Sequence, residues 1–324
     1  MSFLAQRVGQ ALLVLAGVVT LIFFMLRLIP GDPVSVIAPS ANAVAKAQIR
    51  VDLGLDQPLF VQYLRFLGQA AHGDFGRSYF FQGSAIDLVV HALPYTAALA
   101  SGALALALLL AIPLGILSAV FADRPLDRAI LGFCLILQSS PNFWVALLLL
   151  SSVAVKTGLF PTVGFVGPIS LVLPAVALSV SLIAVLSQVV RNSLVDVLRT
   201  EMTTAMRARG LPLSRIVLVH GMRLIGVPLL TVVGAQFGYL LGGAVVIEYI
   251  FNYPGLGLLT LNAVLRRDYP LLQVITLVTA LIFLVINLLI DLSYGLIDGR
   301  LAPTRRIGAR SFLRFRRFSG TTAP

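Results

Sequence analysis

Long apolar runs alternate with short charged segments along the whole chain. Each run is close to the length of about 20 residues that an α-helix needs to cross the hydrocarbon core of a bilayer. Serine, asparagine and proline interrupt the third and fourth runs, which spanning helices tolerate when neighbouring helices satisfy the freed backbone groups. The pattern predicts an all-α integral membrane protein with six transmembrane helices, at residues 8–26, 97–122, 129–155, about 168–190, 224–247 and 271–290.

The first run is predicted to remain in the protein as an anchor. It is longer than the apolar core of a secretory signal, and Arg27 follows it directly. The small residues Ala41 and Ala43 lie too far downstream to mark a cleavage site.

Basic residues predict the orientation, because cytoplasmic flanks of spanning helices carry an excess of Lys and Arg. With the N-terminus inside, sixteen of the 24 Lys and Arg residues fall in cytoplasmic segments. Both termini are therefore expected in the cytoplasm, and the net charge of +11 reflects this bias rather than nucleic-acid binding. The basic C-terminal tail is expected to be a solvated flank, with contact to anionic lipid headgroups as the alternative.

Composition and missing motifs narrow the function. With 58% hydrophobic and 11% charged residues, the chain lies outside the averages of soluble domains. A nucleotide-binding P-loop needs a lysine after glycine, but the lysines Lys46 and Lys156 follow alanine and valine. The three histidines form no metal-ligand motif, and no G-x-S-x-G elbow is present. The lone Cys134 allows no intramolecular disulfide. We therefore predict no catalytic, metal or nucleotide site within this chain.

Small residues recur on one face of the fifth run. Gly234, Gly238 and Gly242 are spaced by four residues, so another helix can approach this face closely. Plain helix packing is one interpretation, and a face that slides when a pathway opens is the other. Gln236 and Tyr239 fall on other faces of the same helix and are candidates to line a passage.

Two acidic residues, Glu248 and Asp291, lie at span boundaries. An ionisable group at membrane depth is by default a functional hypothesis. The alternative interpretation is that Glu248 only marks the external interface and that Asp291 only pairs with an arginine at the inner one.

The region between the first two runs is predicted to form short external helices. The segment "NAVAKAQIRVDLG" ends at Gly54, and Asp56 is expected to cap a following helix with Pro58 in its first turn. Leu59, Tyr63, Leu64 and Leu67 share one face of that helix. We expect this face to pack on the membrane domain, and contact with an external partner is the alternative.

The cytoplasmic segment "EMTTAMRARGLPLSRIVLVHGMR", residues 201–223, carries the most informative pattern. Apolar residues from Leu194 to Met206 form one helical stripe, and most arginines lie on other faces. Gly210 is expected to stop the helix and Pro212 to start another. Such a projection suits a membrane subunit that receives movement from a soluble partner, although an interfacial amphipathic helix has the same pattern.

Several ordered motifs resemble one family, the membrane subunits of binding-protein-dependent ABC importers, and specifically the B-type permeases of the dipeptide, oligopeptide and nickel group. These motifs are "RLIPGDP" (27–33), "LGLDQPLFVQYLRFLGQAAHGDFGRSY" (53–79), "LPYTAALA" (93–100), "RARGL" (207–211), "EYIFNYPGLGLLTLNAVLRRDYPLLQ" (248–273) and "DLSYGLIDGRL" (291–301). The resemblance covers nearly the whole chain.

The resemblance implies a type I ABC importer transmembrane fold in a bacterial inner membrane. It implies an anchor and external segment at 1–92, a core at 93–298 and a basic tail at 299–324. It also implies a homologous second permease, two P-loop ATPases that hold ATP and Mg, an external substrate-binding protein and a peptide substrate. The implied ATPase coupling loop contains Arg199, Glu201, Ala205, Arg207, Arg209, Gly210, Ser214 and Arg215.

Two departures from the family pattern concern single residues. The family's Glu-Ala-Ala motif reads Thr204-Ala205-Met206 here, and its final Asp-Pro-Arg reads Asp298-Gly299-Arg300. The first departure leaves the ATPase contact unassigned at the residue level. A nickel or other small-solute importer is the alternative within the family, and a stand-alone channel or secondary carrier is the alternative outside it.

Overall fold

The computed structural model describes residues 3–297 apart from 29–31, 33, 36–37 and 82. Within this described part the chain is helical, and its sole β feature is an isolated bridge between Arg77 and Ser84. The helices are α1 (Phe3–Leu28), α3 (Ala43–Asp52), α4 (Leu59–Ala71), α5 (Ala85–Val120), α6 (Pro125–Ser139), α7 (Asn142–Leu149), α8 (Val172–Leu198), α9 (Glu201–Ala208), α10 (Leu213–Arg215), α11 (Met222–Ile250), α12 (Leu256–Leu265) and α13 (Tyr269–Ile297). Two π-helical segments, Leu150–Val155 and Ile216–Gly221, extend α7 and lead into α11, and a 3₁₀ turn, Pro168–Leu171, precedes α8.

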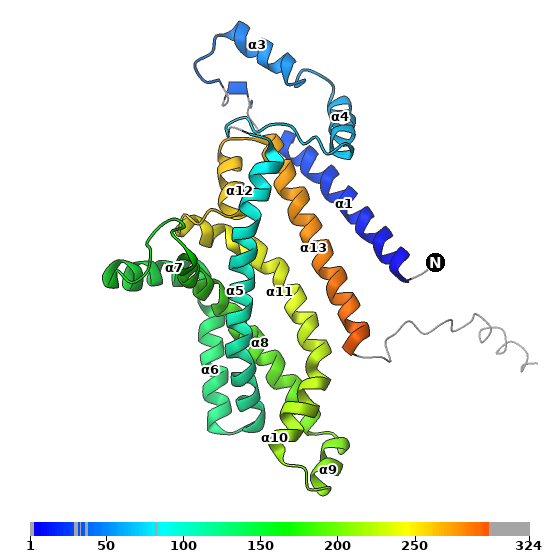
Figure 1. Ribbon diagram of the computed structural model, residues 1–324, viewed down its shortest axis with the longest axis vertical. Coiled ribbons are helices and arrows are strands. Elements are labelled where there is room, and N and C mark those ends of the chain that lie inside the picture. The colour runs from blue at the N-terminus through cyan, green and yellow to red at the C-terminus, as the bar shows by residue number, and fades with distance from the viewer. Residues whose placement is uncertain (1–2, 29–31, 33, 36–37, 82, 298–324) are drawn as a thin grey trace, which may run out of the picture.

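Helices α5 and α8 pack against each other at the centre of the bundle (Figure 1). The buried side chains along α5 are mostly small, and they include Ala100, Ala103, Ala107 and Ala111. At Gly115 a Cβ atom would lie 2.7 Å from Val190 Cγ1 and 2.8 Å from the Ser187 carbonyl oxygen. Small residues on α5 therefore permit the close approach of α8.

Four described helical segments are long and apolar enough to cross a membrane: Ala85–Val120, Pro168–Leu198, Leu213–Ile250 and Tyr269–Ile290. A fifth crossing results if Pro125–Ser139 and Asn142–Val155, which are bent by 89°, count as one span. The apolar part of α1, Leu12–Leu28, is shorter. The prediction of an all-α membrane protein is thus confirmed, with four to five candidate spans in the described residues.

The third predicted span is a bent pair of helices instead of one continuous helix. Ser140 adopts an extended conformation (φ −84°, ψ 118°), and Pro141 follows it before α7 begins at Asn142. Proline has no N–H to continue the α6 ladder, and it restricts the preceding residue to the extended region. Helix α7 therefore runs almost at a right angle to α6 and extends to one side of the bundle (Figure 1).

Helices α3 and α4 lie at one end of the molecule, and α9 and α10 lie at the other (Figure 1). Helix α4 contacts α1, but only part of the predicted face does so: the Tyr63 hydroxyl is 2.7 Å from Thr20 Oγ1, and the Phe66 ring stacks on Phe23. Leu59 and Leu64 of the predicted face are 49% and 51% exposed. The predicted cap is wrong, because Pro58 occupies the N-cap of α4 without a side-chain hydrogen bond. The extended conformation of Pro58 (ψ 141°) moves the start of the helix beyond the reach of Asp56.

Candidate functional site

The exposed turn between α8 and α11 is built by capping at both ends of α9. Thr200 caps the start, and its Oγ1 accepts a hydrogen bond from Thr203 N at 3.4 Å. At the other end Gly210 has φ 81°, Gly210 N donates to Arg207 O (2.9 Å), and Leu211 N donates to Met206 O (3.2 Å). This pair of bonds is a Schellman motif, which needs a left-handed residue at the position of Gly210. The predicted stop at Gly210 and restart after Pro212 are confirmed.

The single apolar stripe predicted from Leu194 to Met206 is interrupted. Helix α8 ends at Leu198, and Thr200 is extended (ψ 152°) because it serves as the N-cap of α9. Leu194 is buried in the bundle, whereas Met202 on α9 is 45% exposed. The apolar face of α9 therefore remains available at the surface through Met202.

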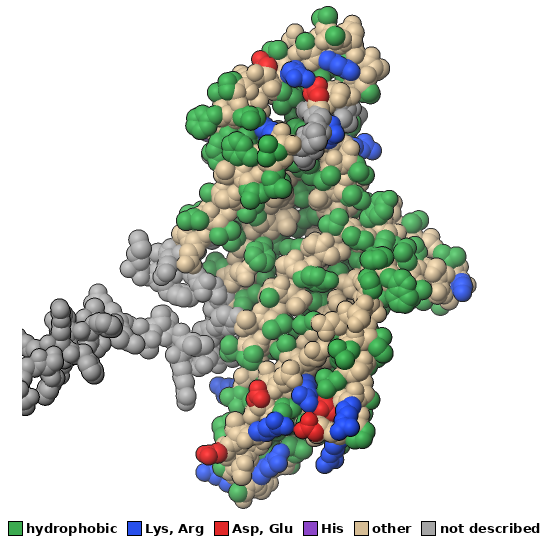
Figure 2. Space-filling view, turned by 180° about the vertical axis from the view of Figure 1, so that it is seen from behind, with side chains coloured by type: hydrophobic (Ala, Val, Ile, Leu, Met, Phe, Trp, Pro, Cys, Tyr) green, Lys and Arg blue, Asp and Glu red, His purple; other side chains and the backbone are tan. Residues whose placement is uncertain are grey.

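All eight residues predicted for the coupling loop lie at this end and are exposed: Arg199, Glu201, Ala205, Arg207, Arg209, Gly210, Ser214 and Arg215. Figure 2 shows Lys and Arg side chains gathered there, below a broad hydrophobic surface. Of these eight residues, Arg199 forms an ion pair among the described residues, with its Nη2 3.4 Å from Asp123 Oδ2. The arrangement presents a basic surface with a few apolar side chains to the surroundings.

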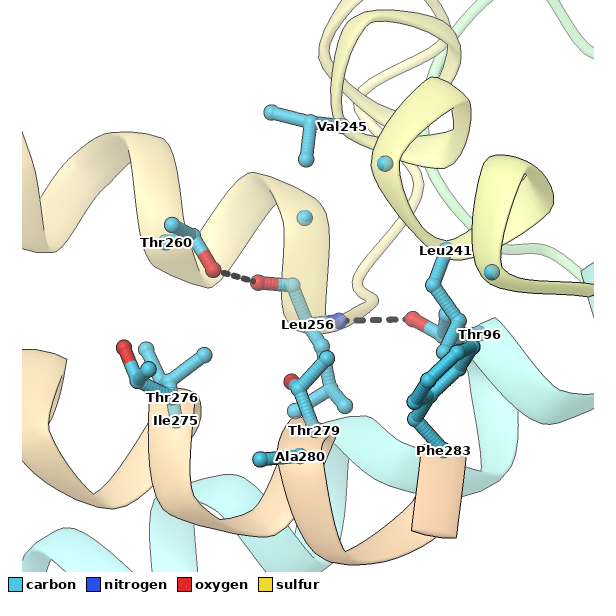
Figure 3. Close-up of a pocket in the computed structure, with 13 residues that line it drawn as sticks. Thr96, Leu241, Val245, Leu256, Thr260, Ile275, Thr276, Thr279, Ala280 and Phe283 are labelled. Carbon is cyan, nitrogen blue, oxygen red and sulfur yellow. Dashed lines mark hydrogen bonds between the residues drawn. The ribbon is translucent and has the colours of Figure 1, made fainter. Parts of the chain in front are cut away.

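A groove of about 600 Å³ lies between four helices (Figure 3). We call it the threonine groove, and it is lined by Thr96 on α5, Gly238, Leu241, Gly242 and Val245 on α11, Leu256, Gly257 and Thr260 on α12, and Ile275, Thr276, Thr279, Ala280 and Phe283 on α13. None of these described lining residues is charged. The Thr260 and Thr276 hydroxyls donate to carbonyl oxygens of their own helices, Leu256 O (2.6 Å) and Leu272 O (2.9 Å). The wall is therefore mostly apolar.

The glycine row of α11 has two roles, and Gly238, which also lines the threonine groove, takes part in both. A Cβ on Gly234 would collide with the Ile290 side chain, and one on Gly238 would lie 2.8 Å from Phe283 Cε2. These two glycines allow α13 to pack closely, as the packing interpretation predicts. A Cβ on Gly242 would meet nothing within 4 Å, and this residue lines the threonine groove. The other two candidates on this helix, Gln236 and Tyr239, are not among the residues that line the groove.

Glu248 is fully buried at the end of α11, so it does not simply mark a solvent interface. Its Oε1 accepts a hydrogen bond from Thr96 Oγ1 (2.6 Å), and its Oε2 accepts one from Leu258 N (3.0 Å). Thr96 Oγ1 in turn accepts a bond from Leu256 N (2.7 Å). Burial and the neighbouring Glu248 raise the pKa of Tyr253, in the turn after α11, to about 12, so this phenol stays neutral.

Sequence reasoning missed a buried ion pair near the coupling loop. Asp127 on α6 is 1% exposed, and Arg191 on α8 donates to it from Nη2 (2.6 Å) and Nε (3.2 Å). The Asp127 carboxylate also accepts bonds from Ser118 Oγ and from Asp123 N (2.9 Å). In the sequence Asp127 opens a helix next to an arginine-rich turn, which is typical of an ordinary flank, so only the tertiary contact reveals the pair.

A second missed carboxylate, Asp268, ties two segments together at the opposite end. It is fully buried before α13 and accepts hydrogen bonds from Ser78 Oγ, Tyr79 N (3.2 Å) and Leu271 N (3.3 Å). Burial and the nearby Asp268 raise the pKa of Tyr79 to about 12. Asp268 thus fixes the loop after α4 to the start of α13.

The predicted site residue Asp291 falls in α13, and its side chain lies outside the described residues, as does the tail at 299–324. The described part contains no group of three or more His, Cys, Asp or Glu side chains that could hold a metal ion.

Comparison with known proteins places these features in a family. Residues 111–303 match the family described as binding-protein-dependent transport system inner membrane component. Residues 1–100 match the family described as the N-terminal part of such membrane components.

Curated relatives extend over almost the whole chain. A probable peptide ABC transporter permease of Sinorhizobium fredii is 35% identical over 92% of this chain and 98% of its own length. The glutathione transport system permease of Salmonella paratyphi A is 36% identical with the same coverage. An inward-facing structure of the MetNI methionine ABC transporter has a TM-score of 0.58 at 17% identity, covering 66% of this chain and 97% of the MetNI chain. At this identity the structural likeness supports the fold.

Proposed function

Because the chain belongs to the family of binding-protein-dependent transport system inner membrane components, we propose that it is a permease subunit that forms half of a translocation pathway for peptide uptake. The permeases of peptide and glutathione transport systems, about 35% identical to it, support a peptide substrate. A nickel or other small-solute importer is the alternative within the family. In the proposed complex the chain has no ATPase site of its own.

The threonine groove is the proposed part of the pathway in this subunit. Its apolar wall has no charged side chain among the described lining residues, so it offers little that selects one peptide over another. A homologous second permease would close the open side of the groove. Selection among peptides would then rest on an external substrate-binding protein.

We propose six transmembrane helices, with α1 as the first and the bent pair α6 and α7 as the third. The 26 residues of α1 extend about 39 Å at 1.5 Å per residue, which is enough to cross a bilayer. The arginine-rich end at α9 would face the cytoplasm together with both termini, and α3 and α4 would lie outside. The location would be a bacterial inner membrane.

The exposed turn around α9 is the proposed contact for the partner ATPases, which would bind and hydrolyse ATP with Mg. Helix α9 is held by caps at both ends, and its apolar and basic side chains are exposed, so it can seat in a partner groove. Movement of the ATPases would then reach the groove through α8 and α11, which flank the turn. A difference in the affinity of the ATPases for two permease conformations would shift their populations.

The exposed, doubly capped α9 is the single observation that carries this proposal, and co-purification tests it. The chain is co-expressed with the candidate ATPase subunits, as wild type and as a variant with Arg209→Glu and Gly210→Pro. We expect the wild type to retain the ATPase in detergent and the variant to lose it. Lys46→Glu, a charge reversal on α3 at the opposite end, is the control and should retain it. A wild type that never retains an ATPase would favour a stand-alone channel or carrier.

Substrate class needs a second measurement. The complex is reconstituted in vesicles with the binding protein, and uptake of labelled dipeptides and tripeptides is compared with uptake of nickel. ATP-dependent peptide uptake is the expected result. Uptake of nickel without peptide uptake would replace the peptide assignment by the small-solute alternative.

A further inference from the structure

The N-terminus of α12 is held by side chains from two other helices. The first N–H groups of a helix have no partner within it, and the N-cap residue of α12, Gly255, has no side chain to offer. Leu256 N instead donates to Thr96 Oγ1 on α5 (2.7 Å), and Leu258 N donates to Glu248 Oε2 on α11 (3.0 Å). Helix α12 is therefore capped from outside, and its positive dipole end meets a carboxylate.

Thr96 and Glu248 act on α12 as one connected unit. The Thr96 hydroxyl accepts the Leu256 N–H and donates its own proton to Glu248 Oε1 (2.6 Å). Tyr253 N also donates to the Glu248 carbonyl oxygen (2.7 Å), which closes the turn between α11 and α12. The Thr96 and Glu248 side chains are buried, at 2% and 0% exposure. In such surroundings a carboxylate that loses its donors is strongly disfavoured.

Two glycines make room for this arrangement. A Cβ on Gly255 would overlap with the Glu248 carboxylate and the Thr96 hydroxyl. A Cβ on Gly257 would lie 2.5 Å from the backbone Cα of Val245 and 2.9 Å from Glu248 Oε2. The backbone of α12 therefore rests directly against α11, with no flexible side chain between them to permit sliding.

The four residues Thr96, Glu248, Gly255 and Gly257, which we call the α12 clamp, lie at one wall of the threonine groove. Thr96 and Gly257 line the groove themselves, and α12 adds Leu256 and Thr260 (Figure 3). We infer that Thr96 and Glu248 are positioning residues that join α12 to the adjoining ends of α5 and α11 as one rigid wall, which stays assembled while the transporter changes conformation. Pathway opening would then occur by movement of this wall as a body, without release of α12. The inference rests on the proposed function for its link to transport.

Hydrogen exchange measures the rigidity directly. The peptide covering residues 252–262 is followed in the complete complex without nucleotide and with a non-hydrolysable ATP analogue. We expect equally slow exchange of the Leu256 and Leu258 amides in both states. If these amides exchange faster in one of the two states than in the other, α12 is released during the cycle, and the inference is overturned.

Variants test whether the clamp positions the groove wall for transport. Thr96→Val removes the hydroxyl. Glu248→Gln replaces one carboxylate oxygen by an amide nitrogen, which cannot accept a hydrogen bond. In each variant we expect these amides to exchange about tenfold faster, as for the loss of one buried hydrogen bond, and peptide uptake per ATP hydrolysed to fall. Thr96→Ser keeps the hydroxyl and should restore both values.

Folding and function remain separable in this design. Retained ATPase in detergent and unchanged exchange of α8 show that a variant is folded. Normal uptake per ATP in folded Thr96→Val and Glu248→Gln would overturn the positioning role. Hydrogen exchange can be measured on the isolated chain, without substrate or ATPase. A wild type that takes up no peptide would therefore refute the proposed function, and the exchange of the Leu256 and Leu258 amides would still test the α12 clamp.

Discussion

Glycine positions in the bundle differ in what surrounds them, although they look alike in the sequence. We expect Gly115→Ala to destabilise the protein by about 1–3 kcal/mol through overpacking, because its Cβ would meet Val190 and the Ser187 carbonyl. Gly132→Ala on α6 is the matched control, since a Cβ there meets nothing within 4 Å. Thermal unfolding in detergent gives the comparison. Equal midpoints for the two variants would contradict the close α5–α8 contact.

The Asp127–Arg191 pair is buried, so loss of one partner leaves an unpaired charge. We expect Asp127→Ala to cost about 3–5 kcal/mol of stability. Arg199→Ala is the control, because the Arg199 and Asp123 side chains are 70% and 77% exposed and such pairs contribute about 0–1 kcal/mol. The two variants are compared by thermal unfolding in the same detergent. If both unfold like the wild type, the buried pair contributes nothing measurable.

At the scale of elements, the bend between α6 and α7 has a local cause that can be removed. Pro141→Ala restores a backbone donor and frees Ser140 to become helical. Spin labels at positions 133 and 148, in a Cys134→Ala background, report the geometry. A continuous helix places these backbone positions about 22 Å apart at 1.5 Å per residue, and the 89° bend holds them closer. We expect the distance to lengthen in the variant.

An unchanged distance in Pro141→Ala would assign the bend to tertiary packing of α7 on α8.

For helices α4 and α9, by contrast, local sequence signals predict that a helix forms. The starts and stops of α9 follow from Thr200, Gly210 and Pro212, whose effects reach only a few residues. The sequence predicts too early a start for α4, because Asp56 is a good capping residue but the extended backbone at Pro58 delays the helix to Leu59.

At the scale of the whole molecule, the two ends should lie on opposite sides of the membrane. In a Cys134→Ala background, we expect Ser214→Cys to react with an impermeant maleimide in inside-out vesicles and Ala47→Cys to react in intact spheroplasts. Both positions are exposed and lie at opposite ends. The excess of Lys and Arg at the α9 end is the physical reason. Labelling of both from the same side would refute the proposed orientation.

The sequence by itself determined the class of protein, the positions of most spans and the turn around α9. These features depend on hydrophobic length, on charge bias and on capping residues, all of which act over one segment of chain. The ordered motifs added the family resemblance, which the matches over residues 1–100 and 111–303 confirm.

Only the tertiary structure decided which polar residues meet. Glu248 lies 152 positions from Thr96, Asp127 lies 64 from Arg191, and Asp268 lies 190 from Ser78. No periodicity or spacing connects such pairs, because their contacts arise from helix packing between distant segments. The sequence indicates that Glu248 is an unusual carboxylate. Its contact with the start of α12, beside the threonine groove, joins separate segments, so only the fold reveals it.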